Sequence, residues 1–296
     1  MANKSARRRR PYVVVATKGA GPAANPAPSR APRAAAKSRR PGRRTPRPWW
    51  AWGVVGGAGL AFLGIAFLLL HGAAPAEPTV TESSRSAPVP GPADAAALQA
   101  IKKISSSPFL DGGRPVVFFM GGQFCPFCAA DRWSFVKATS RFGTWTGLRS
   151  LHSKEGTDGF ASLPTYDLTQ AAFQSDLLSI RVREVADVNG NPLQSLQPDE
   201  QQLVNQYDPG GAIPFTVVGG SMGEYKMDLA YSPGLIQGIN FDSLRAAVDG
   251  DARTPAAEAI NGSADALTAL ICKLTGGRPD SVCSTGYIQG LVKQIQ

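Results

Sequence analysis

The chain has 296 residues, which is long enough for one or two domains with a real core, and a formal net charge of +9. The charge is uneven, because residues 1–48 hold 14 of the 31 Lys and Arg residues and no acidic residue. The other 248 residues hold 17 basic and 22 acidic residues, so the basic character says nothing about the folded part. Rich in Ala, Pro, Arg and Gly, residues 1–48 are predicted to be a disordered tail.

An apolar run with three tryptophans near its start follows the basic tail. It contains no charged residue and is long enough to cross a hydrocarbon core of ~30 Å as a helix. We therefore predict one transmembrane helix over residues 49–71. The alternative is a cleaved signal peptide, with a small-x-small sequence at residues 74–76. The apolar part of a signal peptide usually runs only ~7–15 residues, so the length favours an anchor.

The order of basic tail and apolar run predicts the topology. By the positive-inside rule the N-terminus is cytoplasmic and everything after the anchor is extracytoplasmic, in a single-pass protein of the cell membrane. The tail's arginines would be drawn to anionic lipid headgroups; nucleic-acid phosphates are the weaker alternative, and no nucleic-acid partner is expected. Residues 72–93, rich in Pro, Ala and Ser, are predicted to be an extended linker. All four cysteines follow it, on the side where disulfides persist.

The extracytoplasmic domain is predicted over residues 94–296. Asp94 is expected to cap an amphipathic helix over residues 94–106. Residues 115–120, PVVFFM, are apolar throughout, as expected of a central strand buried on both faces. A helix is then predicted over residues 128–143, which begin at the second cysteine and end at a glycine.

The remaining elements alternate between strands and helices. The sequence predicts strands at 163–168, 177–188, within 210–220 and around 225–229, and helices at 198–208, 240–248 and 254–277. Residues of about 153–206 read as a strand-bearing insert, and residues of about 255–296 as a helical C-terminal extension. Cys272 falls near the end of the last helix, and Cys283 is expected in the loop beyond it.

Cys125 and Cys128 form a C-x-x-C pair where the predicted strand gives way to a helix. The start of a helix presents free N–H groups and a partial positive charge, which stabilise a thiolate. Cys125 would be the attacking cysteine at the cap, and Cys128 the more buried cysteine that resolves a mixed disulfide. Pro126 suits the first turn, where its missing N–H costs nothing.

Two other interpretations of this pair stay open. Zinc sites use the same spacing, but usually twice or together with a pair of histidines, and only His152 falls in the predicted domain. We therefore expect no metal and no cofactor. A static disulfide is the other alternative, although so short a ring stabilises little by loop closure.

A proline before a predicted strand supports the redox interpretation. Ile213 and Pro214 lie in GGAIPFTVVGG, which resembles the thioredoxin cis-proline loop. A cis bond between them would expose a backbone edge beside Cys125, where a substrate chain can pair in β fashion. A trans proline at the strand start is the alternative. Phe124 and Phe127, together with Ile213, are expected to position the substrate.

Four segments together, FFMGGQFCPFCAADRW, SRFGTW, AIPFTVVGG and ALICKLTGGRPDSVC, resemble a family of bacterial and archaeal membrane-tethered proteins classed as a domain of unknown function. The resemblance covers residues of about 94–296. It implies a thioredoxin-like α/β sheet flanked by helices, with Cys125 as nucleophile, Cys128 as resolving cysteine and Pro214 as cis-proline. The chain departs from thioredoxin at Pro126-Phe127, which looks more like glutaredoxin. The acidic residue that helps deprotonate thioredoxin's second cysteine is not evident in PVVFFM.

Cys272 and Cys283 are expected to form a structural disulfide that ties the last helix to the loop after it. A second redox pair that relays electrons to the C-x-x-C is the alternative, but its spacing offers no helix-cap activation. Trp133 is expected in the core. For Arg132, a role in favouring a nearby thiolate and a solvated position are both open.

The sequence as a whole predicts a membrane-anchored thiol–disulfide oxidoreductase whose partners are protein thiols and disulfides. Oxidase, reductase and isomerase share such a site and differ by potential and partners, so the direction is open. The alternative is a non-catalytic, thioredoxin-like envelope protein that keeps the fold for binding and holds structural disulfides.

Overall fold

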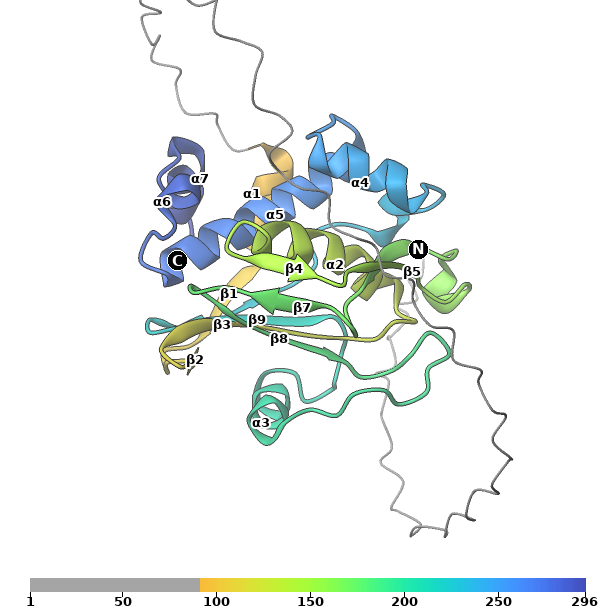
Figure 1. Ribbon diagram of the computed structural model, residues 1–296, viewed down its shortest axis with the longest axis horizontal. Coiled ribbons are helices and arrows are strands. Elements are labelled where there is room, and N and C mark those ends of the chain that lie inside the picture. The colour runs from red at the N-terminus through yellow and green to blue at the C-terminus, as the bar shows by residue number, and fades with distance from the viewer. Residues whose placement is uncertain (1–90) are drawn as a thin grey trace, which may run out of the picture. The chain divides into compact units, whose positions relative to one another are not determined.

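The computed structural model describes residues 91–296. They form a mixed α/β structure in which one six-stranded sheet carries helices on both faces (Figure 1). The strands are β1 Ile101–Ser105, β2 Leu110–Asp111, β3 Arg114–Gly121, β8 Ser179–Glu184, β9 Phe215–Gly220 and β10 Gly223–Met227. Their order is β1-β10-β9-β3, after which β3 pairs with both β8 and β2. Only β8 runs parallel to β3; the other pairs in this sheet are antiparallel.

Strand β3 is the centre of the sheet, and every residue from Pro115 onwards in it is buried. Its side chains alternate between two cores. Val117 and Phe119 pack in the core that α2 and α5 cover, whereas Val116 and Phe118 pack in the core under α3. Burial of each Val or Phe side chain stabilises the folded chain by about 1.5–3 kcal/mol relative to leaving that side chain exposed. The observed strand and its burial confirm the predicted central strand. An unbroken apolar run is favourable there because both faces of the strand are covered.

The helices divide unevenly between the faces of the sheet (Figure 1). Helices α1 Pro92–Gln99, α2 Pro126–Thr139, α4 Phe241–Asp249 and α5 Pro255–Leu274 lie on one side, and α3 Pro198–Tyr207 lies on the other. Helix α5 begins where the Thr254 hydroxyl accepts the backbone N–H of Ala257 at 3.2 Å, with Pro255 in its first turn. Helices α2, α3, α4 and α5 lie where the sequence predicts helices, and only the first predicted helix differs.

The first predicted helix is wrong in its second half. Helix α1 ends at Gln99, and residues 101–105 form β1, which pairs antiparallel with β10. The apolar spacing of this segment fits a helix as well, but β10 would otherwise leave its outer backbone groups unpaired. Asp94 does not cap the helix by itself. Gly91 is the N-cap, and its backbone N–H donates to the Asp94 carboxylate at 2.6 Å.

The segment predicted as an insert, residues 153–206, contributes to the main sheet. It contains β8, which extends the sheet beyond β3, and α3, which covers the face opposite α2. The extra structure lies between α2 and β8 and consists of two small two-stranded sheets. They are formed by β4 Thr144–Thr146 with β7 Ala172–Gln174, and by β5 Arg149–His152 with β6 Pro164–Asp167.

The C-terminal part is helical, as predicted, and is tied back by a disulfide. Cys272 near the end of α5 is bonded to Cys283, with 5.5 Å between the two Cα atoms. The predicted disulfide is therefore confirmed. Cys283 lies in a short helix, α6 Asp280–Cys283, rather than in a loop, and α7 Gly286–Val292 comes after it.

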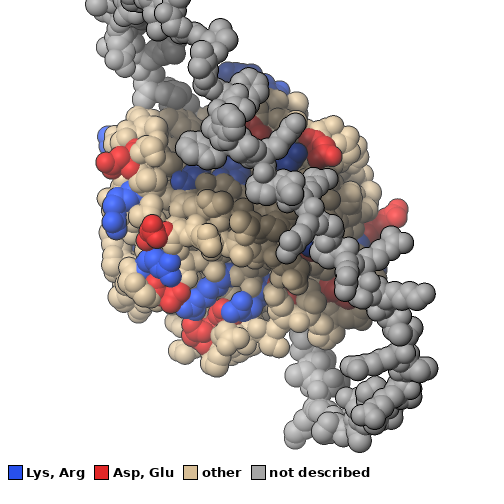
Figure 2. All heavy atoms as spheres, in the orientation of Figure 1, with Lys and Arg blue, Asp and Glu red and all other residues tan. Residues whose placement is uncertain are grey.

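The described surface mixes charges of both signs. Figure 2 shows basic and acidic side chains interspersed over one face of the molecule. Within residues 91–296, no helix is both long and apolar enough to cross a membrane. The predicted tail, anchor and nearly all of the linker, residues 1–90, lie outside the described residues.

Candidate functional site

The C-x-x-C pair lies where β3 turns into α2. Cys125 is the N-cap of α2, and its sulfur accepts the backbone N–H of Cys128 at 3.3 Å. The amide N–H of Cys125 in turn donates to the carbonyl of Gly122 at 3.1 Å. Both cysteines are free thiols and both are buried, with Cys125 4% exposed and Cys128 fully enclosed. The sequence folds this way because Pro126 fits only the first turn of a helix, which fixes the cap one residue earlier.

The loop before β9 forms the opposite wall of the site. The peptide bond between Ile213 and Pro214 is cis, as predicted. The Cys125 thiol lies 3.8 Å from the Ile213 carbonyl oxygen, a long contact from sulfur to oxygen. The structure therefore brings together Cys125, Cys128 and the Ile213–Pro214 bond, although 88 residues separate Cys125 from Ile213.

The aromatic residues of the motif pack around the turn that carries Cys125. Phe124 and Ile213 close over Gly122, where an added Cβ would lie 2.8 Å from the Phe124 ring and 3.0 Å from the Ile213 δ-methyl. Phe127 packs edge-on against Phe160, with 5.7 Å between the ring centres. All three predicted positioning residues, Phe124, Phe127 and Ile213, are half-buried beside the dithiol.

The two cysteines differ in acidity. The hydrogen bond from the Cys128 thiol is the main cause that lowers the pKa of Cys125, helped by backbone N–H groups at the helix start and the positive charge of Arg132 and opposed by burial. Burial is the main cause that raises the pKa of Cys128, and the hydrogen bond to Cys125 adds to it. Cys125 is therefore the sulfur that ionises first, as expected for an attacking thiolate.

A fully buried ion pair lies beside the dithiol. Arg132 of α2 donates from Nε and Nη2 to the two carboxylate oxygens of Glu184 at 2.8 and 2.6 Å. Its Nη2 also donates to the Gly122 carbonyl at 2.9 Å. Both side chains are 0% exposed, so of the two positions left open for Arg132 the solvated one is wrong. The motif itself contains the signal for Arg132, one helical turn after Cys128, but nothing local marks Glu184 as its partner.

A second buried acidic group, Asp131, lies on α2, next to Arg132. The Asp131 carboxylate accepts the Thr216 hydroxyl of β9 at 3.1 Å. Burial raises the pKa of Asp131 to about 6, against the hydrogen bond from Thr216 and the positive charge of Arg132. The neighbouring Trp133 is 1% exposed, which confirms it as a core residue, and its indole N–H donates to the Pro164 carbonyl at 2.9 Å.

Metal ligation was one alternative for the cysteine pair. Across residues 91–296, no three His, Cys, Asp or Glu side chains lie together in a way that could hold a metal ion.

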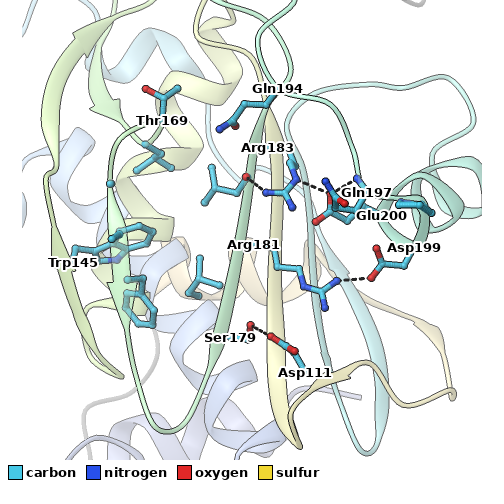
Figure 3. A pocket seen from close by; sticks show the side chains of 17 residues that line it. Asp111, Trp145, Thr169, Ser179, Arg181, Arg183, Gln194, Gln197, Asp199 and Glu200 are labelled. Carbon is cyan, nitrogen blue, oxygen red and sulfur yellow. Dashed lines mark hydrogen bonds and ion pairs between the residues drawn. The ribbon is translucent and has the colours of Figure 1, made fainter.

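A groove of about 650 Å³ lies elsewhere, between the outer edge of β8, the β4–β7 sheet and α3 (Figure 3). Arg181 and Arg183 point from β8 toward α3, where they pair with Asp199 at 2.5 Å and Glu200 at 2.7 Å. Neither Cys125 nor Cys128 lines it. Because its arginines are already paired with carboxylates, the groove offers little unused charge, and the dithiol is the better-supported site.

The described residues thus define a mixed α/β domain in which a buried pair of free cysteines opens a helix. The chain belongs to the family described as Domain of unknown function (DUF929), which matches residues 100–273. The match runs from just before β1 into α5 and so includes the dithiol and the cis-proline but not Cys283. No curated protein and no solved structure matches the chain.

Proposed function

We propose that this protein is a thiol–disulfide oxidoreductase that is anchored in the cell membrane and acts on protein substrates outside the cytoplasm. The observation that carries the proposal is the surroundings of the Cys125 thiol. This free thiol lies at a helix start, its sulfur accepts a hydrogen bond from the Cys128 backbone N–H at 3.3 Å, and it lies 3.8 Å from the Ile213 carbonyl oxygen. A helix-capping thiol with lowered pKa is the arrangement that produces a reactive thiolate.

The fold we propose is thioredoxin-like. The chain order β3, α2, β8, α3, β9, β10 and then helix is the order of that core. The pairing supports it as well, because β8 is parallel to β3 while β9 and β10 follow antiparallel on the other side. On this view residues of about 140–178 are an insertion within the core, between α2 and β8.

The proposed reduction of a substrate proceeds in two exchanges. The Cys125 thiolate attacks one sulfur of a substrate disulfide, the substrate S–S bond breaks, and the other substrate sulfur leaves as a thiolate and takes up a proton. Cys128, having lost its proton, then attacks the Cys125 sulfur and releases the second substrate thiolate. Two electrons have passed to the substrate, and a Cys125–Cys128 disulfide remains. The reverse sequence oxidises a substrate dithiol.

The two walls of the site suggest how a protein substrate is held. The backbone of Ile213 lies next to the Cys125 sulfur, so an extended chain that pairs with it would bring its own cysteine to Cys125. Phe124, directly before the attacking cysteine in the chain, and Phe127, two residues after it, provide half-buried apolar surface. Pro214 positions this loop at the start of β9.

One observation favours the non-catalytic alternative. Cys125 is only 4% exposed, so the structure around it must open to some extent before a substrate sulfur can reach the thiol. A binding protein with the same fold would not need that opening. Turnover of a disulfide substrate separates the two functions.

Trapping in cells tests the proposal. The variant Cys128→Ser keeps the attacking thiol and removes the resolving one, so mixed disulfides between Cys125 and its substrates should accumulate. They should appear on non-reducing gels, vanish with dithiothreitol, and be absent from the matched control Cys125→Ser/Cys128→Ser. Absence of trapped species, together with no reduction of insulin and no oxidation of a reduced protein by the purified chain, would leave the binding function as the better account.

A further inference from the structure

Arg132 and Glu184 form the buried ion pair nearest to the dithiol. Their two hydrogen bonds, 2.8 and 2.6 Å long, make a fork in which each carboxylate oxygen has its own N–H donor. Both side chains are completely buried. Such a pair is weak evidence for stability, because desolvation of the two charges offsets their attraction. Its place beside two cysteines therefore calls for another explanation.

One carbonyl joins the ion pair to the dithiol. The Gly122 oxygen accepts the amide N–H of Cys125 at 3.1 Å and Arg132 Nη2 at 2.9 Å. Arg132 also lies four residues after Cys128, a spacing that places the two on the same side of α2, and Cys125 is the N-cap of that helix. A change at Arg132 is thus passed directly to the turn that carries the attacking cysteine.

Arg132 has a donor that the ion pair does not use. Its Nη1 is buried and has no hydrogen-bond partner among the residues the structure describes. A buried N–H without an acceptor is costly, and that cost falls when negative charge appears nearby. The same guanidinium lowers the pKa of Cys125 and opposes the large upward effect of burial on the pKa of Cys128.

Two acidic groups interact with Arg132, one from β8 and one from α2. Glu184 of β8 acts through Arg132, which it holds and partly neutralises. Asp131 of α2 is hydrogen-bonded to Thr216 on β9. Arg132 is therefore the cation that the ionised dithiol meets, and Glu184 is the group that limits its strength.

We propose that Arg132 is the positioning residue of the dithiol: it fixes the Gly122 turn and supplies the positive charge that favours the Cys125 thiolate, while Glu184 sets how much of that charge is felt. This rests on the proposed redox function of the same site.

Two variants test the proposal because it predicts opposite signs. In Glu184→Gln the guanidinium loses its counter-charge, so Cys125 should be alkylated faster at neutral pH than in the wild type. In Arg132→Met/Glu184→Gln no charge remains, so alkylation should be slower than in the wild type. The two variants should differ by about tenfold near pH 7. The measurement is the rate of iodoacetamide alkylation of Cys125 in the reduced full chain from pH 5 to 9, read by peptide mass spectrometry.

The matched control is a second ion pair near the far end of α2, between Arg141 and Asp265 at 2.6 Å. The variant Arg141→Met/Asp265→Asn also removes one charge of each sign, and it should leave the alkylation of Cys125 unchanged. Arg132→Lys keeps the positive charge but loses the two-bonded contact with Glu184. It should therefore lower the unfolding temperature while the alkylation rate of Cys125 stays close to that of the wild type. Thermal unfolding of each variant accompanies every rate.

The outcomes are distinct. Equal alkylation rates in Glu184→Gln and in the double variant overturn the proposal, and so does an unchanged rate in Glu184→Gln if the double variant does not fold. If the rates shift as predicted but Cys128→Ser traps no substrate, the redox function fails and the role of Arg132 stands. If substrates are trapped while the rates stay equal, the role of Arg132 fails alone.

Discussion

The Asp131 carboxyl group makes stability depend on pH in a way that one substitution removes. Burial raises the pKa of Asp131 from its ordinary value of 3.8 to about 6. Well below pH 4 the group is protonated in both folded and unfolded chains and costs nothing. Well above pH 6 it is ionised in both, and the buried carboxylate costs the folded state about 3 kcal/mol relative to the unfolded chain. Stability from this group is therefore lost as pH rises from about 4 to about 6.

Asp131→Asn keeps the size of the side chain and cannot ionise. Its advantage in free energy of unfolding over the wild type should grow between pH 4 and 7, by up to about 3 kcal/mol if the amide keeps the contact with Thr216. Urea denaturation at a series of pH values measures this difference. Thr216→Val, which removes the hydrogen bond that lowers the pKa of Asp131, should move the loss of stability to higher pH.

The exposed Asp249→Asn variant controls for the loss of a surface carboxylate. Parallel stability curves for the wild type and Asp131→Asn from pH 4 to 7 would show that the buried carboxylate carries no such cost. They would mean that water or a cation reaches Asp131 and that the helix is less tightly packed on β9 than its 3.1 Å contact indicates.

Two further predictions concern the disulfide and the turn. The disulfide joins Cys272 and Cys283, which are 11 residues apart, so Cys272→Ala/Cys283→Ala should lower the free energy of unfolding by about 2–3 kcal/mol, measured with urea, without changing the alkylation of Cys125. A loss of dithiol reactivity in that variant would instead favour electron relay between the two pairs. Gly122→Ala would place a Cβ 2.8 Å from the Phe124 ring and 3.0 Å from the Ile213 side chain. It should lower the free energy of unfolding by about 1–3 kcal/mol and reduce the rate of insulin reduction. Wild-type stability and wild-type insulin reduction in this variant would show that the turn tolerates a side chain.

The parts of the fold that the sequence predicts are those with a strong local signal. PVVFFM has no polar residue to face water, so only a doubly covered strand suits it. Pro126 can occupy only the first turn of α2, which fixes Cys125 as the cap. The even number of cysteines predicts two pairs, and once the C-x-x-C is set apart, only Cys272 and Cys283 remain to bond to each other.

The parts that the sequence does not predict depend on distant partners. IKKIS has apolar residues at helical spacing, and only the open edge of β10 makes it a strand. The segment 179–184 looks like part of an insert until its pairing with β3 is known. Glu184 reads as an ordinary charge on an alternating strand, and its burial follows from Arg132, which lies 52 residues earlier.

The proposed function requires Cys125 and Cys128 to interconvert between a dithiol and an internal disulfide. The direct test is a redox titration of the purified full chain in glutathione buffers, with free thiols blocked by maleimide and each cysteine read by mass spectrometry. We expect one two-electron transition in which Cys125 and Cys128 become bonded to each other while the Cys272–Cys283 disulfide stays intact. Cysteines at 125 and 128 that remain thiols, or form only glutathione adducts, over the whole range would contradict the proposed function.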